Sequence, residues 1–412
     1  MLKKNQLLVE DIQKRAYNLL VDLTNYNEND KGYGLTLDHN MKPNVASIAA
    51  TGFVLSGYII GVKYGYISYD KAKKIVTKTL ETLANNVGHY KGMFLHFVDI
   101  HTAERFKKNE YSTIDTLLCI KGVMSVEMFF DDEKITSLSR KIIDRIDWNH
   151  FVHTKDGKKM FYMAYNPDRD GDYAAGKSGF IFQWHMLAEQ LLMYVIAAGS
   201  GQLNKKLALQ LYEGFERVEG SYQGHKYFHS PGNTLFVYQY PLCWFDGKNY
   251  IDKDGFSWFE NTKKATLGHR AWNLRNMHKF KTFSRYTFGL TASSTPTGYG
   301  VFHCIPSDSG TYLTDGTVQP NAMVGALVTN PKYALEAIRY MKSIDHVYTE
   351  YGFVDGYNFE KTQPWYSNRY ITIDKGLELL MCNHYLSKDV VDAFMRHSYV
   401  QKGMEVLEWK KI

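Results

Sequence analysis

Carboxylates in apolar or aromatic surroundings are the side chains of this sequence with the clearest potential for chemistry. Glu189 is the one acid of the apolar segment LAEQLLMYVIAAGSG. A carboxylate in such a place is costly unless it is hydrogen-bonded or its pKa is raised, and a raised pKa suits a general acid at neutral pH. The alternative is a structural glutamate tied to an arginine or a backbone group, and the sequence alone leaves both explanations open.

Two aspartates near the C-terminus could supply a partner carboxylate. Asp374 opens an apolar helical segment in RYITIDKGLELL, and Asp355 lies in the preceding loop, in YGFVDGYN. Each also has a structural explanation. Asp374 would be favoured in the first turn of a helix by the helix dipole, and Asp355 would suit a turn before Gly356. One acid and one base carboxylate are what glycoside cleavage requires.

A polar loop at 91–111 leads into a segment, 112–130, that is apolar nearly all round. Ser112 and Asp115 have the S-x-x-D spacing of a capping box, so a helix is predicted to begin there. Asp99, Arg105 and Glu110 share the loop and could bind sugar hydroxyls, or could form surface salt bridges with one another. Aromatic residues in the connecting segments add a second indication of carbohydrate, although each alone suits packing equally well. These aromatics are Trp184, Trp244, Trp258, Trp365 and Tyr366.

Helical periodicity dominates the chain and predicts what must position these groups. After a first amphipathic helix at 11–24, apolar segments alternate with amphipathic ones. The apolar segments are 45–64, 112–130, 184–198, 235–245, 319–328 and 374–385, and the amphipathic ones are 70–86, 132–146, 205–218, 257–277, 332–343 and 388–399. Six such pairs predict an inner ring of helices inside an outer ring, an all-α (α/α)6 barrel. A solenoid would need a tighter and more uniform repeat.

The predicted connections are lopsided. Links from an amphipathic helix to the next apolar one are long, at about 87–111, 147–183, 219–234, 278–318 and 344–373, and most links in the other direction are short. Long loops in a compact domain are usually functional. Because all five precede apolar helices, they are predicted to share one rim of the barrel, with small hairpins such as KKMFYMA at 158–164. No linker divides the chain, so 1–412 is predicted to be a single domain.

Composition narrows the classes of function. The 412 residues are 44% apolar and 22% charged, with a net charge of +6 and no block of lysine or arginine that would indicate a nucleic-acid or membrane partner. The N-terminus lacks the apolar run of a signal peptide, and four cysteines without C-x-x-C spacing predict a reduced, cytoplasmic protein. No phosphate-binding loop, H-E-x-x-H motif or histidine spacing indicates a cofactor or metal, and the oligomeric state is left open.

Nine ordered blocks of the sequence resemble those of one known family. The blocks cover about 91–385 and are FLHFVDIHTAERF, EYSTIDTLL, AEQLLMYVIAAGS, LFVYQYPLCWFD, ENTKKATLGHRAW, FGLTASSTPTGY, DGTVQPNAM, YGFVDGYNF and YITIDKGLELLM. They are similar to successive blocks of the glycoamylase-like domain family, which includes endo-β-1,2-glucanases and glucoamylase-like proteins. The resemblance implies an (α/α)6 barrel and inverting hydrolysis of a β-glucan or gluco-oligosaccharide.

The resemblance also implies which residues form the site. The family acid corresponds to Glu189, and the base corresponds to Asp374, with Asp355 as the alternative. An inverting pair should lie roughly 6.5 to 9.5 Å apart, leaving room for a water molecule. Together with the loop and aromatic residues above, the candidate sugar contacts are Asp99, Arg105, Glu110, Asp115, Trp184, Gln239, Trp244 and Trp365.

The chain departs from the family pattern at positions expected to shape the sugar pocket. Leu187 and Ala188 precede Glu189 where the family has Tyr and Ser or Asn, Ser294 replaces an aspartate, and Tyr238 replaces a histidine. The segment WFDGKN lacks the arginine of the family block. These departures leave β-1,2-glucan specificity open, and a cytoplasmic location favours short oligosaccharides over a polymer.

Two other functions fit the predicted barrel. A polysaccharide lyase would abstract a proton beside a uronic acid, and a rim rich in arginine and lysine would favour it, whereas this rim is acidic. A non-catalytic glycan-binding protein would be consistent with the departures from the family pattern. Linkage, chain length and endo or exo action are not specified by the sequence.

Overall fold

Helices that are buried nearly all round alternate along the chain with helices that bury one face. The computed structural model describes residues 2–168 and 178–412. The buried helices are α2 (Ile48–Lys63), α4 (Thr113–Phe130), α6 (Leu191–Gly199), α8 (Phe236–Gln239), α10 (Pro320–Val324) and α12 (Thr372–Leu386). The covering helices are α1 (Leu2–Asp22), α3 (Tyr69–Asn85), α5 (Glu133–Ile143), α7 (Lys205–Glu213), α9 (Trp258–Asn276), α11 (Pro331–Lys342), α13 (Asp389–Met395) and α14 (Ser398–Val406). The predicted alternation of apolar and amphipathic helices is therefore confirmed.

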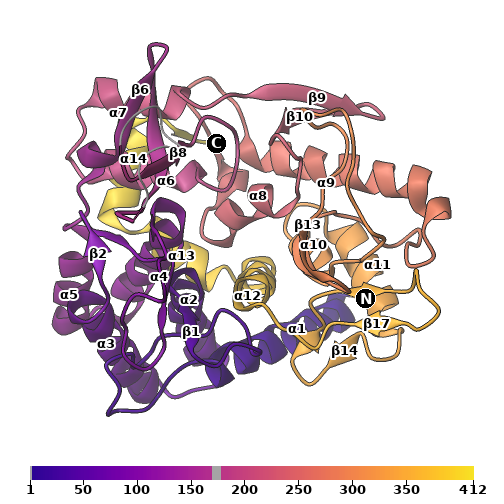
Figure 1. Cartoon of the computed structure of the whole chain (residues 1–412), viewed down its shortest axis with the longest axis horizontal. Helices are drawn as coiled ribbons and strands as arrows, with labels where there is room; N and C mark the ends of the chain where they lie inside the picture. Colours follow the sequence, from indigo (N-terminus) through magenta and orange to yellow (C-terminus); the bar gives the residue numbers. More distant parts are fainter. Residues whose placement is uncertain (1, 169–177) are drawn as a thin grey trace.

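Several of the buried helices pack against the next one in chain order. α2 lies between α12 and α4, α4 also contacts α6, and α10 contacts α12; in Figure 1, α12 lies near the middle of the view. Glycines allow the closest approach, between α2 and α4. A Cβ on Gly52 would lie 2.5 Å from the Cα of Cys119, and a Cβ on Gly122 would lie 2.1 Å from the carbonyl oxygen of Gly52. A side chain at either position would overlap the backbone of the facing helix, so only glycine fits. The close contact fixes the distance between α2 and α4 and their relative position along the helix axes.

Covering helices complete the hydrophobic core. α1 packs on α12, α3 packs on α5, and α14 packs on α6. The helix α3 shows how the sequence produces this, because it begins at the N-cap Ser68 and buries Ala72, Ile75, Val76 and Leu80 on one face. That spacing places apolar residues along a single stripe, while its lysines face outward.

Long connections precede the buried helices and carry small antiparallel sheets. Their paired strands are β1 (Val45–Ser47) with β4 (Phe97–Asp99), β2 (His89–Tyr90) with β3 (Met93–Phe94), β9 (Val218–Tyr222) with β10 (His225–His229), β12 (Ala292–Thr295) with β13 (Gly298–Val301), β14 (Tyr348–Thr349) with β15 (Gly352–Phe353), and β16 (Tyr357–Asn358) with β17 (Trp365–Tyr366). β7 (Lys158–Tyr165) pairs with β5 (Tyr111–Ser112), β6 (Val152–Lys155) and β8 (Phe180–Gln183), and β11 (Tyr250–Ile251) pairs with β18 (Lys410–Lys411). The lopsided connections and the strand predicted at 158–164 are confirmed; part of the connection predicted at 147–183, residues 169–177, lies outside the described residues.

Two helix boundaries matter for the site. α4 begins where the capping box predicts, because the hydroxyl of Ser112 accepts the backbone N–H of Asp115. α6 begins at Leu191 and not at 184, because the strand β8 and a turn occupy the residues before it. Glu189 therefore lies in the turn that leads into α6, and its predicted place inside a helix is wrong. Glu189 nevertheless lies just before the N-terminal end of a buried helix.

Two further observations concern the cysteines and hydropathy. Cys119, Cys243, Cys304 and Cys382 are all buried and unpaired. Among the described helices, none combines the length and the apolar character needed to cross a bilayer.

Candidate active site

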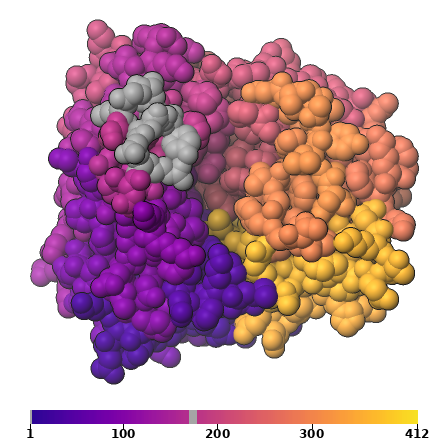
Figure 2. Space-filling view, in the orientation of Figure 1, coloured from indigo at the N-terminus to yellow at the C-terminus, as the bar shows by residue number. Residues whose placement is uncertain are grey.

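A cleft separates the N-terminal part of the molecule from the part formed by residues around 300 and beyond. Figure 2 shows it between the indigo-to-magenta surface and the orange-to-yellow surface. The hairpin β12–β13 lies on the orange side in Figure 1. The N-terminal ends of α4, α6 and α12 each bring a carboxylate to this region: Asp115, Glu189 and Asp374.

Glu189 has the properties of a general acid. The residue is partly exposed, but its carboxyl group is surrounded by protein, and this burial raises its pKa to about 7. Its own backbone N–H lowers the pKa, the negative charge of Asp115 raises it, and the positive charge of Lys121 lowers it. A carboxyl group with a pKa near 7 holds its proton for a substantial fraction of the time at neutral pH and can donate it.

Lys121 lies in the middle of α4 and is completely buried, with 0% of its surface exposed. No group of the described residues hydrogen-bonds its ammonium, which lies 4.1 Å from the centre of the Trp244 ring. Burial lowers its pKa to about 7, and the nearby Cys243 and Glu189 act in the opposite direction. The cation–π contact with Trp244 and the charge of Glu189 both favour the charged form of Lys121.

Asp355 and Asp374 form a buried carboxyl pair. Their side chains are 3% and 5% exposed. Burial raises the pKa of Asp374 well above its usual value, and the charge of Asp355 and a hydrogen bond with it raise it further. Oδ2 of Asp355 accepts the backbone N–H of Ser294 at 2.6 Å. Two carboxylates so close together cannot both be ionised. Burial and the neighbouring carboxyl therefore favour the protonated form of Asp374, and Oδ2 of Asp355 is held by its hydrogen bond from Ser294.

Two tyrosines connect the acid with this pair. Tyr299, on β13, is 57% exposed, yet its hydroxyl is crowded. Burial of that hydroxyl raises its pKa, and the carboxyls of Asp374, Asp355, Asp38 and Glu189 raise it further. Tyr299 therefore lies within electrostatic reach of both predicted catalytic groups.

Tyr240 makes the second connection from the interior. It is fully buried behind the cleft, and its pKa is raised by burial and then by Asp374, Tyr299, Cys243 and Glu189, in decreasing order. Both tyrosines interact electrostatically with Glu189 and Asp374, so these two carboxyls lie in the same region of the molecule.

A charged triad occupies the start of α4. Nδ1 of His96 lies 2.8 Å from Oε1 of Glu110, and its Nε2 lies 3.5 Å from Oδ1 of Asp115. Burial alone would lower the pKa of His96, but the carboxylates of Asp115 and Glu110 more than offset it and raise the pKa to about 9. The imidazolium is therefore positively charged at neutral pH. Ser112 also donates its hydroxyl to Oδ2 of Asp115 at 2.5 Å, so this carboxylate is held in place close to Glu189.

Several predicted sugar contacts have structural partners instead. Oδ1 of Asp99 accepts the backbone N–H groups of His101 and Thr102, and Arg105 donates to Asn109, Asn166 and Asp168. These two residues shape the loop before α4. No contact among the described residues places Trp365, which is half-buried on β17, at the cleft, and its role stays a prediction.

Two of the tryptophans predicted to contact sugar, Trp184 and Trp244, belong to the hydrophobic core of the structure. Both are buried: Nε1 of Trp184 donates to Thr113 at 3.0 Å, and Nε1 of Trp244 donates to Ser56 at 3.0 Å. Gln239 is likewise buried, and its amide donates to the carbonyl of Ala322 at 2.8 Å. Apolar neighbours in the sequence do not show whether a tryptophan lies in the core or at the rim, because this large side chain is common in both places.

Sequence reasoning missed Lys121, His96, Asp38 and Tyr299. Lys121 carried a usable signal, because it is the one cation well inside an apolar segment, as Glu189 is the one acid of another. His96 was visible in the polar loop, but its two carboxylate partners depend on the fold of that loop. Tyr299 lies next to the turn of a hairpin whose orientation is set by tertiary contacts.

Comparisons with known proteins fit this geometry. The model of the Glycoamylase family, described as "Putative glucoamylase", matches residues 181–398, which is more than half of the chain. The chain belongs to the Glycoamylase family. The predicted resemblance is thereby confirmed, and the match includes Glu189, Asp355 and Asp374.

Relatives of this Glycoamylase family member have related descriptions. An exo β-1,2-glucooligosaccharide sophorohydrolase (non-reducing end) from Parabacteroides distasonis is 22% identical over 400 residues, and the match spans 89% of this chain and 53% of that protein. The chain therefore spans about half the length of this curated relative.

Solved structures share the fold. One described as a "putative glucoamylase" from Bacteroides uniformis has a TM-score of 0.85 at 23% identity, covering 99% of this chain and 98% of that one. The endo-β-1,2-glucanase from Chitinophaga pinensis, in complex with sophorotriose and glucose, has a TM-score of 0.84 at 21% identity, covering 99% of each chain. At these identities the likeness establishes the fold alone.

Two of the departures from the family pattern can be placed in this site. Ser294, where the family has an aspartate, accepts a hydrogen bond from Nε of Arg369 at 2.8 Å, and its backbone N–H holds Asp355. Tyr238, where the family has a histidine, is buried and donates its hydroxyl to Asn233 at 2.7 Å. The first departure adjoins the aspartate pair directly, whereas the second lies in the core.

Proposed function

We propose that this chain is a glycoside hydrolase that cleaves β-1,2-linked gluco-oligosaccharides with inversion at the anomeric carbon. The observation that supports the proposal is the electrostatic proximity of Glu189 and a buried aspartate pair, both of which act on Tyr299. The pKa of Glu189 is about 7 and the pKa of Asp374 is raised well above its usual value by burial. One proton donor and one carboxylate that can activate water are the two groups that inverting hydrolysis requires.

Glu189 acts as the acid in this proposal. As the glycosidic bond breaks, its proton passes to the departing oxygen, which leaves as a hydroxyl group, and Glu189 becomes a carboxylate. The low polarity that raises the pKa of its carboxyl group makes the protonated form available at neutral pH. Lys121, with its buried ammonium nearby, then stabilises the carboxylate formed in this step.

Asp355 acts as the base, with Asp374 as the residue that holds the shared proton. A water molecule on the opposite face of the sugar ring donates a proton to the Asp355 carboxylate while its oxygen attacks the anomeric carbon. The N–H of Ser294 at 2.6 Å orients this carboxylate. This assignment reverses the order suggested by the family resemblance, in which Asp374 was the base and Asp355 the alternative.

The substrate class is supported by the descriptions of the relatives and by the cleft. The Parabacteroides relative acts on β-1,2-glucooligosaccharides and the Chitinophaga structure holds sophorotriose. The exposed ring of Tyr299 provides an apolar platform for a sugar ring beside the carboxyls. The imidazolium of His96, held between two carboxylates, keeps the opposite wall polar.

Architecture and location are part of the proposal. We take the buried helices and their covering helices to close into an (α/α)6 barrel in a single domain, 1–412. Four pairs of buried helices, α12–α2, α2–α4, α4–α6 and α10–α12, are in contact, and the long connections precede the buried helices. The four unpaired buried cysteines are compatible with a reducing compartment, and we propose the cytoplasm.

The test is hydrolysis of defined oligosaccharides. Sophorotriose and longer β-1,2-gluco-oligosaccharides, with β-1,3-, β-1,4- and α-1,4-linked glucans as controls, are incubated with the wild type and with Glu189→Gln, and new reducing ends are counted. We expect release from β-1,2-linked substrates by the wild type and a loss of about 10²- to 10⁴-fold in the variant. Equal rates for the two proteins would overturn the assignment of the acid, and release only from another linkage would overturn the substrate class.

A further inference from the structure

A sizeable cavity lies on the outer wall, and none of Glu189, Asp355 and Asp374 lines it. It has a volume of about 730 Å³ and is bounded by the second half of α1, the start of α3, the loop that contains residues 26–33 and the tip of the hairpin β14–β15. This volume is within the range of small-molecule sites, about 300–1,000 Å³. None of the residues that form the proposed catalytic machinery lines it.

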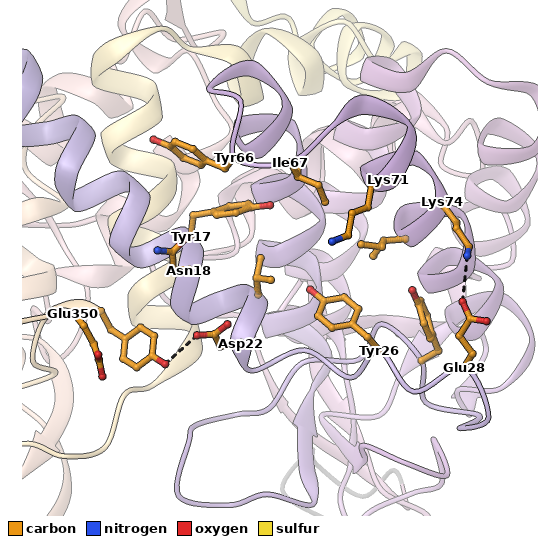
Figure 3. A pocket seen from close by; sticks show the side chains of 14 residues that line it. Tyr17, Asn18, Asp22, Tyr26, Glu28, Tyr66, Ile67, Lys71, Lys74 and Glu350 are labelled. Atoms are coloured by element: carbon orange, nitrogen blue, oxygen red, sulfur yellow. Dashed lines mark hydrogen bonds and ion pairs between the residues drawn. The ribbon is translucent and has the colours of Figure 1, made fainter.

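Five tyrosines line this cavity, which is an unusual concentration of one side chain. Tyr17 and Tyr33 are nearly buried and form its floor, while Tyr26, Tyr66 and Tyr351 are partly exposed. The rings of Tyr17 and Tyr66 have centres 5.2 Å apart and are tilted by 49°, so they make an angled apolar wall. Figure 3 shows Tyr17, Tyr26 and Tyr66 around the cavity.

The hydroxyl groups of three of these tyrosines already form hydrogen bonds with the protein. The hydroxyl of Tyr66 accepts Nε2 of Gln13 at 3.4 Å. Tyr26 shares a hydrogen bond of 2.7 Å with the hydroxyl of Tyr58, and Tyr351 donates to Oδ2 of Asp22 at 2.9 Å. What these residues offer to a ligand is therefore chiefly their ring surface, which suits stacking against a flat apolar face.

Charged groups of both signs surround the rings. The carboxylates of Asp22, Glu28 and Glu350 and the ammonium groups of Lys71 and Lys74 line the cavity. Lys74 pairs with Glu28 at 3.3 Å, whereas no ion pair or hydrogen bond from a described residue holds the ammonium of Lys71. Figure 3 shows Lys71 extending into the space near Tyr17 and Tyr26.

This mixture selects among classes of ligand. A phosphate or other anion would meet three carboxylates, an organic cation would meet two ammonium groups, and a purely apolar ligand would desolvate charges without replacing their hydrogen bonds. A neutral molecule with many hydroxyl groups and flat apolar faces satisfies both the charges and the rings. That description fits a carbohydrate.

We propose that this cavity is a second, non-catalytic binding site for a short neutral oligosaccharide. Because we take the ligand to be of the same class as the substrate, this inference rests on the proposed function for the identity of the sugar. The site would bind without cleaving, since its acids are exposed and Glu28 is held as a carboxylate: hydrogen bonds from Lys78 and Lys74 lower its pKa. It would keep oligosaccharide near the enzyme between catalytic events.

The experiment measures binding stoichiometry in a protein that does not consume the ligand. Sophorotriose is titrated by calorimetry into Glu189→Gln, and into the same protein with Tyr66→Ala added. Tyr64→Ala is the matched control, because Tyr64 lies beside Tyr66, with ring centres 5.9 Å apart, but does not line the cavity. We expect two sites in Glu189→Gln and in the control, and one site, or a second site weakened at least about tenfold, with Tyr66→Ala.

A second variant distinguishes a loss of ligand binding from a loss of folding. Tyr351→Ala removes a ring from the opposite wall, and circular dichroism identifies any variant that does not fold. A single site in Glu189→Gln, or two unchanged sites in both Tyr66→Ala and Tyr351→Ala, would overturn the proposal. Failure of the proposed function is distinguishable, because it would appear as absence of hydrolysis by the wild type while these tyrosine variants still lost a binding site.

Discussion

Replacing Lys121 with methionine should change the pH dependence of the reaction without removing any group that contacts substrate. Lys121 is fully buried in α4, and its charge lowers the pKa of Glu189. Methionine has a similar volume and no charge, so the packing against Trp244 is largely kept. The perturbation is therefore mainly electrostatic.

Its magnitude follows from the coupling between the two groups. The pKa of Glu189 is about 7, so kcat/KM should fall about tenfold per pH unit above that value as the acid loses its proton. An opposite charge within a few ångströms shifts a carboxyl pKa by about one unit or more, but Lys121 is itself only partly protonated here, with a pKa of about 7. Lys121→Met should therefore move the basic limb upward by about 0.5 to 1 unit.

Stability provides a second reading of the same change. The pKa of Lys121 is about 7 in the folded protein, against 10.5 when it is unperturbed. Below pH 7 the buried charge therefore lowers the free energy of unfolding by its full amount. This destabilisation disappears as the pH rises towards 10.5. At about 1.4 kcal/mol per pKa unit, the cost at pH 7 is about 4 kcal/mol, before the contact with Trp244 offsets part of it. Lys121→Met should therefore unfold at a higher temperature than the wild type at pH 6, and at nearly the same temperature at pH 10.5.

The assay is kcat/KM for sophorotriose from pH 5 to pH 9.5, with Leu118→Met as the control. Leu118 is buried on the same helix and carries no charge, so this variant should keep the wild-type profile. A basic limb in Lys121→Met that coincides with the wild type, or that moves to lower pH, would refute the reasoning about the acid and its neighbour. Lower activity at every pH without a shift would indicate a purely structural role.

Three further changes test the other charged groups. Asp374→Asn should raise the unfolding temperature at pH 7 but not at pH 3. The pKa of Asp374 is raised in the folded protein, so this residue destabilises the fold above its unperturbed pKa of 3.8 and has no such effect below it. Equal effects at both pH values would contradict this. His96→Gln should destabilise the protein at pH 6 and lose this effect as the pH passes about 9, since the raised pKa of His96 stabilises the fold only while the imidazole is protonated; urea unfolding at pH 6 and pH 9.5 measures it. Asp355→Asn should lose about 10²- to 10⁴-fold in turnover and regain part of it with azide, which replaces activated water; rescue of Asp374→Asn alone would assign the base to Asp374.

Local signals predicted most of the fold. The spacing of Ser112 and Asp115 located the start of α4, because both partners of a capping box lie within one turn. Alternating apolar and amphipathic segments predicted the order of the helices for a similar reason. The start of α6 was predicted too early, since residues 184–190 form an irregular segment and a turn that follow strand β8. The position of β8 is set by its pairing with β7, which depends on residues distant in sequence.

The site was predicted less completely. Glu189, Asp355 and Asp374 stood out because a carboxylate in an apolar or aromatic segment is energetically unusual whatever its neighbours are. The division of roles within the aspartate pair could not be read in the same way, because it depends on the N–H of Ser294, which is 61 residues from Asp355 in the chain. The clustering of Tyr299 with these acids likewise requires the hairpin β12–β13 to be placed by tertiary packing.

The assignment of Glu189 as the acid is tested most directly by changing the leaving group. Glu189→Gln is compared with the wild type on sophorotriose and on 2,4-dinitrophenyl β-sophoroside, whose leaving group departs without protonation. We expect the variant to lose about 10²- to 10⁴-fold on sophorotriose and to retain nearly wild-type rates on the activated substrate. An equal loss on both substrates would contradict the account.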